Sequence, residues 1–305
     1  MIDYKIIDFR CRPPMAAQKL IFDLKLGRLK WQNRFICPPS QATLPSMYKV
    51  GTDEGLDLLY QEMIEAGIDK IVVPGRNLSN PPKAVVKESG ITSLNVTDEE
   101  LVELDRRYQG RAIGMHGIDA EQSSEEIVAG IEKAVSEHGL NGAVLEIGYS
   151  VDEAGRPLQL NDRRLYPIYE TMIRLDKPLM LQSGIYAGHD IDANHWPPLD
   201  RVMQDFPGLK MILAHGGYPR ILDAIALCVK HPSLYISPDI YCFFPGGRIY
   251  IEAISQLPDQ FLFGTAYPFG TFVESLDLTL AFPLDREVMA NYLYHNAARV
   301  LELDD

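Results

Sequence analysis

The chain alternates short apolar runs with longer amphipathic stretches, and this alternation limits its fold more than any other feature of the sequence. Eight runs are rich in Ile, Val, Leu and Met and mostly lack polar alternation, as the buried strands of a parallel sheet do. They span Lys5–Phe9, Lys70–Val73, Ala112–Met115, Gly142–Ile147, Pro178–Leu181, Lys210–Ala214, Leu234–Ile236 and Phe261–Phe263. Eight strands separated by helices predict an α/β fold of the (β/α)8 TIM-barrel type. A doubly wound open sheet is the alternative, but no GxGxxG motif follows a strand.

Helix start signals and one unusual segment complete the predicted organisation. Residues Thr97–Glu100 and Ser123–Glu126 both fit a capping box, and Asp285–Leu303 reads as one long C-terminal helix. Residues 13–50 are rich in Pro, Gln, Lys and aromatic side chains. We interpret them as an insertion after the first strand that covers the mouth of the barrel, meaning the carboxyl ends of its strands. With no linker in the sequence, residues 1–305 are predicted to form a single domain.

Composition excludes several classes of function. The 29 Lys and Arg residues against 42 Asp and Glu give a net charge of −13, which disfavours binding to nucleic acid or to anionic lipid. No apolar run approaches the roughly 20 residues needed to cross a membrane, and the N-terminus does not resemble a secretory signal. The 4 cysteines are scattered without CxxC spacing. We therefore expect a cytoplasmic protein with reduced thiols.

Polar side chains follow the predicted strands, and the catalytic residues of such barrels come from these strand ends. His215 and Asp239 are candidates for proton transfer, because imidazole titrates near neutral pH and a carboxylate can orient it. The guanidinium groups of Arg10, Arg12 and Arg76 suit a carboxylate ligand. Further candidates for substrate contact are Asn77, His116, Glu146, Gln182, Tyr241 and Tyr267. Each has a structural alternative: the arginines could simply pair with nearby acids, and the histidines could complete strand ends.

Several segments resemble the amidohydrolase-related family. They are, in order along the chain, Ile7–Arg12, Asp162–Pro167, Leu209–Gly217, His231–Tyr235, Phe263–Phe269 and His295–Leu301. The resemblance implies a TIM barrel. It also implies one of three activities found in that family: a metal-dependent hydrolase, a decarboxylase, or a lactonase that works without metal.

The departures from the family pattern are informative. The family begins with Asp-x-His-x-His, whose histidines hold a divalent metal, and Arg10 and Arg12 occupy those positions here. Gln182 and Ala266 replace two further ligands, so that only His215 is retained. A guanidinium has no lone pair to donate and repels a dication, and zinc takes three or four protein ligands. We therefore predict no metal and no other cofactor. The alternative is a rebuilt metal site that joins His215 to Asp8, His116, Glu146 and Asp239.

Two functions remain open on these residues. The first is a metal-independent enzyme that hydrolyses a lactone or ester, or carries out a lyase step such as hydration or decarboxylation. Its substrate would be a small carboxylated molecule anchored by arginines. The second is a non-catalytic barrel that only binds an anion, and a rebuilt metal site would instead give a metal-dependent hydrolase. The expected partner is a small anionic metabolite rather than nucleic acid or membrane, and a homo-oligomer is possible.

Overall fold

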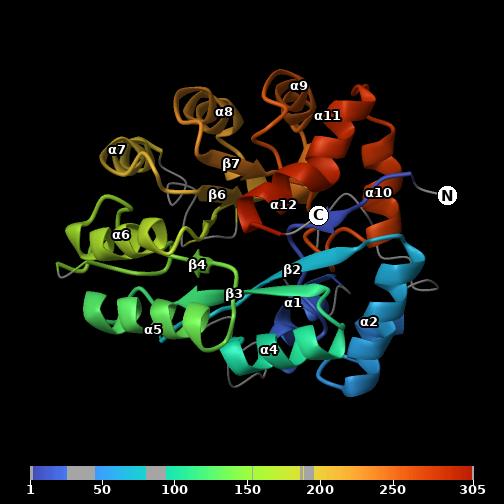
Figure 1. The fold of residues 1–305 in the computed structure, drawn as a ribbon, viewed down its shortest axis with the longest axis horizontal. Helices are drawn as coiled ribbons and strands as arrows, with labels where there is room; N and C mark the ends of the chain where they lie inside the picture. Colours follow the sequence, from blue (N-terminus) through green and yellow to red (C-terminus); the bar gives the residue numbers. More distant parts are fainter. Residues whose placement is uncertain are drawn as a thin grey trace.

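Seven parallel strands form one curved sheet in which each strand pairs with its neighbour along the chain. The computed structural model describes residues 3–25, 45–79, 94–152, 154–185, 188 and 196–303. The strands are β1 (Ile7–Asp8), β2 (Lys70–Pro74), β3 (Ala112–Ile118), β4 (Ala143–Leu145), β5 (Leu179–Gln182), β6 (Met211–Ala214) and β7 (Leu234–Ser237). Helices surround this sheet on its outer side (Figure 1). The predicted α/β TIM-barrel architecture is confirmed.

The eighth predicted strand closes the barrel without forming a regular ladder. The Leu262 N–H donates to the Ile236 carbonyl at 2.9 Å, and the Phe9 N–H donates to the Phe263 carbonyl at 2.7 Å, so this segment bonds both β7 and β1. However, Phe263 donates its own N–H to the Tyr292 carbonyl at 3.0 Å instead of to a strand. Because the Phe263 N–H is not available to a neighbouring strand, the predicted strand Phe261–Phe263 is reduced to an isolated bridge between Phe261 and Ile236.

Two helices begin at the capping boxes that the sequence predicts. The helices are α1 (Lys19–Lys25), α2 (Asp53–Glu65), α4 (Asp98–Arg107), α5 (Ser124–Ser136), α6 (Tyr166–Arg174), α7 (Pro197–Asp205), α8 (Ile221–Lys230), α9 (Arg248–Gln256), α10 (Phe272–Leu280), α11 (Arg286–Ala290) and α12 (Asn296–Leu301). Both predicted capping boxes are present, at Thr97 before α4 and at Ser123 before α5. Within the described part of the chain, no helix is both long and apolar enough to cross a membrane.

The C-terminal segment is helical as predicted but is not one regular helix. A π-helical turn, Asn291–His295, separates α11 from α12. In this turn the Asn296 N–H donates to the Asn291 carbonyl, so the Tyr292 carbonyl is not used by its regular partner. That carbonyl accepts the Phe263 N–H instead, which ties the C-terminal helix to the segment that closes the barrel.

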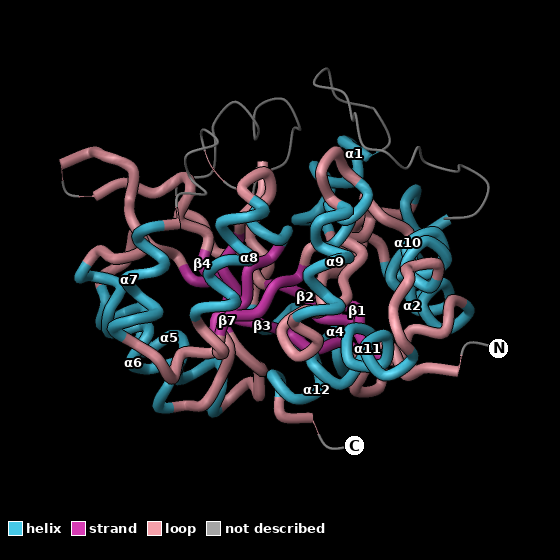
Figure 2. Tube along the Cα trace, turned by 90° about the horizontal axis from the view of Figure 1, so that it is seen from above, coloured by secondary structure: helices cyan, strands magenta, loops and turns pink. Residues whose placement is uncertain are grey.

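The barrel interior is apolar below its mouth. Alternate residues of the strands point inward and form one buried cluster, which includes Ile7, Val72, Ile113, Met115, Val144, Met180, Ile212 and Leu262. The cluster continues into Tyr294, Ala297 and Val300 of the C-terminal helical segment, which lies on the opposite side of the strands from α1 (Figure 2). Polar side chains that point into the barrel are therefore gathered at the mouth.

Candidate functional site

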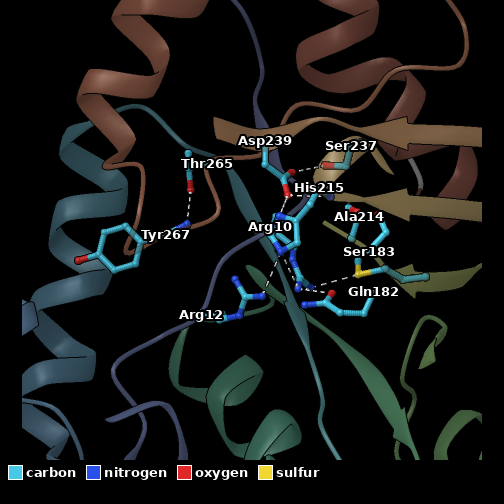
Figure 3. A network of polar contacts seen from close by, with 12 residues as sticks. Arg10, Arg12, Gln182, Ser183, Ala214, His215, Ser237, Asp239, Thr265 and Tyr267 are labelled. Carbon is cyan, nitrogen blue, oxygen red and sulfur yellow. Dashed lines mark hydrogen bonds and ion pairs between the residues drawn. The ribbon is translucent and has the colours of Figure 1, made fainter. Parts of the chain in front are cut away.

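Two arginines that follow β1 place their guanidinium groups at the centre of the mouth, and we call Arg10 and Arg12 the buried arginine pair. Their side chains converge with Gln182 and His215 (Figure 3). Arg10 donates one N–H to the Gln182 Oε1 and another to the Met180 sulfur at 3.3 Å. The Nη2 atoms of Arg10 and Arg12 each lie 3.4 Å from the Nε2 of His215. The structure thus brings together residues predicted from three different strand ends.

Asp239 holds His215 from the opposite side of the imidazole ring. Its Oδ2 lies 2.7 Å from the His215 Nδ1 and accepts the His215 backbone N–H at 3.2 Å. Its Oδ1 accepts the hydroxyl of Ser237 at 2.6 Å. The contact between Nδ1 and Oδ2 is close but lacks hydrogen-bond geometry. We assign the imidazole proton to Nδ1 because a carboxylate lies beside it, whereas the guanidinium groups beside Nε2 can only donate.

Burial sets the charge of His215. The pKa of the imidazole is lowered to about 4, chiefly by desolvation, with the nearby guanidinium groups acting in the same direction and Asp239 opposing them. The imidazole is therefore neutral at physiological pH. The backbone is also unusual here, because His215, Asp239 and Ala266 have φ angles of 60°, 56° and 51° at three successive strand ends. Left-handed non-glycine residues are costly and often mark functional sites.

Arg76 is held differently from the buried arginine pair. Its Nε and Nη2 donate to the two carboxylate oxygens of Glu146 at 3.1 and 3.2 Å. Among the described residues, by contrast, neither Arg10 nor Arg12 forms an ion pair with a carboxylate. The Arg10 Nε and the Arg12 Nη1 are buried and have no hydrogen-bond partner in that part of the chain. Two buried cations therefore retain unused donors.

Arg10 and Arg12 line a small pocket at the mouth. Its volume is about 10 Å³, which is enough for roughly one water molecule. Desolvation lowers the pKa of Arg10 to about 10 and holds the pKa of Arg12 well below its ordinary value. The pocket is lined by Arg10, Arg12, Gln18, Pro74, Gly75, Arg76, Val144, Glu146 and Gln182.

Two predicted site residues lie away from this pocket. The Nδ1 of His116 is 2.9 Å from both carboxylate oxygens of Asp98, at the start of α4. His116 follows the inward-facing Met115 on β3, so its side chain points to the outer helices. Asn77 accepts a hydrogen bond from the Asn95 amide at 3.5 Å, in the segment that leads to α4.

The two predicted tyrosines have different environments. Tyr241 packs edge-on against the His215 ring at 5.5 Å between ring centres and stacks on Tyr218 at 4.8 Å. It therefore belongs to the wall behind the imidazole. The hydroxyl of Tyr267 points away from the arginines (Figure 3), donating to Glu62 at 2.9 Å and lying 2.7 Å from the Ser46 hydroxyl. That arrangement fastens the segment around Ser46 to the barrel.

Gln18 is a pocket residue that the strand-end rule did not find. It lies in a 3-10 turn, Ala16–Gln18, that leads into α1. The sequence placed an insertion at residues 13–50 over the mouth, and residues 26–44 of it lie outside the described residues. Of its described residues, Gln18 lines the mouth pocket. The strand-end rule also missed Met180, whose sulfur accepts from Arg10. The alternation of side chains along a strand predicts its inward position, because it precedes Gln182 by two residues on β5.

The residues at the mouth do not fit a divalent metal. In the described part of the chain, no group of three or more His, Cys, Asp or Glu side chains is arranged to hold one. The Nε2 of His215 faces two cationic groups, and the Oε1 of Gln182 accepts from Arg10. Asp8 is turned toward Thr265, from which it accepts two hydrogen bonds at 2.8 and 2.6 Å. The rebuilt metal site that the sequence left open is not assembled by the described residues either. Glu146 is bound by Arg76, and the His116 side chain lies outside the barrel.

Solved structures of similar fold include both uncharacterised and characterised proteins. An uncharacterised TIM-barrel protein from Bordetella bronchiseptica is 29% identical, with a TM-score of 0.78 and coverage of 98% of both chains. A dihydroxybenzoic acid decarboxylase from a Polaromonas species, solved with bound manganese and an inhibitor, is 17% identical, with a TM-score of 0.69 over 99% of this chain and 98% of its own. A 4-oxalomesaconate hydratase from Rhodopseudomonas palustris is 19% identical, with a TM-score of 0.64 over 97% and 95%.

The sequence comparison extends over most of the chain. No curated protein sequence matches it. The sequence profile of the amidohydrolase family, however, matches residues 76–303, which include five of the seven strands, β3 to β7, together with His215 and Asp239. The chain therefore belongs to the amidohydrolase family.

Proposed function

We propose that this protein is a metal-independent enzyme that binds a small carboxylated substrate through Arg10 and Arg12 and cleaves a lactone or ester bond in it. The observation that carries the proposal is the buried arginine pair, with unused N–H donors at Arg10 Nε and Arg12 Nη1 and no described carboxylate as partner. A buried cation without a counter-charge in direct contact is unfavourable, and the carboxylates of Asp239 and Glu146 act on these two arginines only from a distance. An anionic ligand would supply that charge, and the pocket, which has room for about one water molecule in this structure, has to widen to admit it.

A carboxylate suits these donors better than a halide or a neutral molecule would. Planar guanidinium groups bind planar carboxylates through two parallel hydrogen bonds, and these charge-assisted bonds are short and strong. The similar structures support the same class of ligand, since dihydroxybenzoic acid and 4-oxalomesaconate are both carboxylic acids by name. The surrounding protein carries a net charge of −13, so selectivity for an anion has to come from the pocket itself.

His215 is suited to move the proton once the ligand is in place. A carboxylate on the buried arginine pair would draw the Nη2 donors from His215 Nε2 and add negative charge near the ring, which raises its proton affinity. Water then loses a proton to Nε2 as its oxygen bonds to the ester carbonyl carbon. His215 returns that proton to the leaving oxygen as the C–O bond breaks. Asp239 keeps the ring oriented with Nε2 toward the reaction.

A general base without a metal limits the substrates. Such a base typically contributes about 10²–10⁴-fold, so an activated ester or lactone is a better substrate than an unactivated amide. The names of the similar structures, a decarboxylase and a hydratase, favour testing a lyase step beside hydrolysis.

One observation favours a second function, a barrel that binds anions without turnover. Burial holds the pKa of His215 at about 4, and its Nε2 faces two guanidinium groups rather than open space. In this arrangement the imidazole acts as a hydrogen-bond acceptor for the arginines and is a weak base.

Turnover by chelator-treated protein separates these functions. We would assay lactones and esters that carry a carboxylate, together with hydroxylated aromatic carboxylates for decarboxylation, and measure binding by calorimetry. The enzyme is supported if turnover survives chelation and His215→Asn abolishes it while retaining affinity, whereas Arg10→Ala abolishes binding. Binding of these acids and esters without turnover of any of them would support the second function, a barrel that only binds anions. Activity that depends on a stoichiometric metal would contradict the metal-independent mechanism.

A further inference from the structure

Gln18 lines the same pocket and has an unused acceptor. The residue is 2% exposed, and its Oε1 is buried without a hydrogen-bond partner among the described residues. The pocket it lines is also lined by Arg10 and Arg12, the two arginines with unused donors. A buried amide oxygen without a partner costs free energy, and an apolar side chain of similar size would avoid that cost.

Local structure does not explain why a glutamine occupies this position. The turn is formed by the backbone, because the Gln18 N–H donates to the Met15 carbonyl at 3.0 Å and Met15 donates to the Pro13 carbonyl at 2.7 Å. The chain just before it is fixed to the barrel, since the Arg12 N–H donates to the Tyr267 carbonyl at 3.1 Å. The segment is therefore held at the mouth without the Gln18 amide, whose Oε1 is left available to a ligand.

The other polar side chains of the pocket do not satisfy the Gln18 acceptor. The arginines offer only donors. The acceptors at Glu146 and Gln182 are already engaged, by Arg76 and by Arg10 respectively. A ligand that satisfies this pocket therefore needs acceptor oxygens for the guanidinium groups and one donor for Gln18.

We propose that Gln18 is a specificity-determining residue that accepts a hydrogen bond from a hydroxyl group of the ligand, so that the site selects hydroxylated carboxylates over carboxylates without the hydroxyl. This inference rests on the proposed carboxylate site at Arg10 and Arg12. It adds the requirement that the ligand carry a donor close to its carboxylate. A site built to hydrogen-bond a hydroxyl rejects the analogue that lacks it, because the protein group is then left buried and unpaired.

Matched pairs of acids test the inference directly. We would titrate the purified full-length protein with glycolate and acetate, with lactate and propionate, and with malate and succinate, using calorimetry at neutral pH. For at least one pair we expect the hydroxylated acid to bind about tenfold more tightly or better. In Gln18→Met the preference should fall to about one, while the affinity for the acid without a hydroxyl stays within about threefold. Gln204→Met, at an exposed position on α7, is the matched control and should retain the preference.

The outcomes distinguish failure of this inference from failure of the proposed function. Equal binding of each pair by the wild type, with binding abolished in Arg12→Leu, would overturn the role of Gln18 and keep the carboxylate site. A preference that persists in Gln18→Met would also overturn it, because the hydroxyl would then contact another group. Absence of binding by any of the acids would overturn the proposed carboxylate site itself. Retained affinity for acetate in Gln18→Met shows that this variant is folded.

Discussion

Arginines on two sides of one pocket are buried in different ways. Arg76 is 17% exposed in its side chain and meets both oxygens of Glu146, which is 9% exposed. The buried arginine pair is at least as deeply buried, yet it contacts an imidazole, an amide and a thioether, with no described carboxylate as partner. A paired arginine can be explained by the fold alone. An unpaired one costs stability in the folded protein, so its position points to a ligand.

Removal of Arg76 tests the arginine that is paired with a carboxylate, and it should have the largest effect on stability. Arg76→Met leaves the Glu146 carboxylate largely buried without its partner, and we expect the free energy of unfolding to fall by about 3 kcal/mol. Urea unfolding followed by circular dichroism measures this. The double variant Arg76→Met with Glu146→Gln removes the uncompensated charge and should recover most of the loss. A single variant as stable as the wild type would show that the ion pair contributes little and would weaken the contrast.

Removal of Arg12 tests the unpaired side and should have the opposite effect on stability. Arg12→Leu replaces a buried cation with an apolar side chain, so the free energy of unfolding should be unchanged or rise by about 1 kcal/mol. Affinity for carboxylates should fall by about 100-fold or more, because a buried charge-assisted contact is lost. Calorimetry and urea unfolding on the same preparation measure both quantities. Marked destabilisation of this variant would mean that Arg12 has a structural partner that satisfies it.

The pH dependence of stability reports on the imidazole beside the unpaired arginines. The pKa of His215 is about 4 in the folded protein against 6.5 ordinarily, so below pH 6.5 the unfolded chain binds a proton that the folded one does not. Stability is therefore lost as pH falls from about 6.5 to about 4. Between pH 7 and 4.5 the wild type should lose about 2 kcal/mol more than His215→Gln.

The comparison with the variant is needed because Asp8 acts in the opposite direction. Burial raises the pKa of Asp8 from 3.8 to about 6, so its contribution to stability decreases as pH rises through this window. Asp8 is present in both proteins, and its effect cancels in the difference. Saturating acetate should reduce the His215 contribution, since an anion on the arginines raises the pKa of the imidazole. An identical pH profile for wild type and variant would contradict the buried neutral histidine.

The fold and the centre of the site follow from simple regularities of the sequence, while the rest depends on tertiary contacts. Apolar runs predict the strands, and the end of a strand predicts where Arg10, Gln182 and His215 meet, because parallel strands finish at one edge. The same rule misplaces His116, since it ignores the alternation of side chains that sends this residue outward after Met115. Gln18 is beyond such a rule, because it reaches the pocket through a loop packed on the barrel.

Tyr267 extends the comparison to a polar group that is paired like Arg76 but lies off the pocket. Tyr267→Phe removes a buried hydroxyl that contacts Glu62 and Ser46, while Ser46 still donates to Glu62 from its backbone N–H at 3.1 Å and its hydroxyl at 2.9 Å. We expect a loss of about 1 kcal/mol in the free energy of unfolding. Carboxylate affinity should stay within about twofold.

Tyr169→Phe is the matched control for this substitution, because it removes a buried hydroxyl that donates to the Leu160 carbonyl at 2.7 Å on the outer helix α6. Urea unfolding and calorimetry should give the two variants similar losses of stability and unchanged binding. If Tyr267→Phe alone weakens carboxylate binding tenfold, the Tyr267 hydroxyl contributes to the ligand site in solution. Tyr267 would then count among the groups that bind the ligand, and a hydrogen bond within the fold would no longer exclude a group from the site.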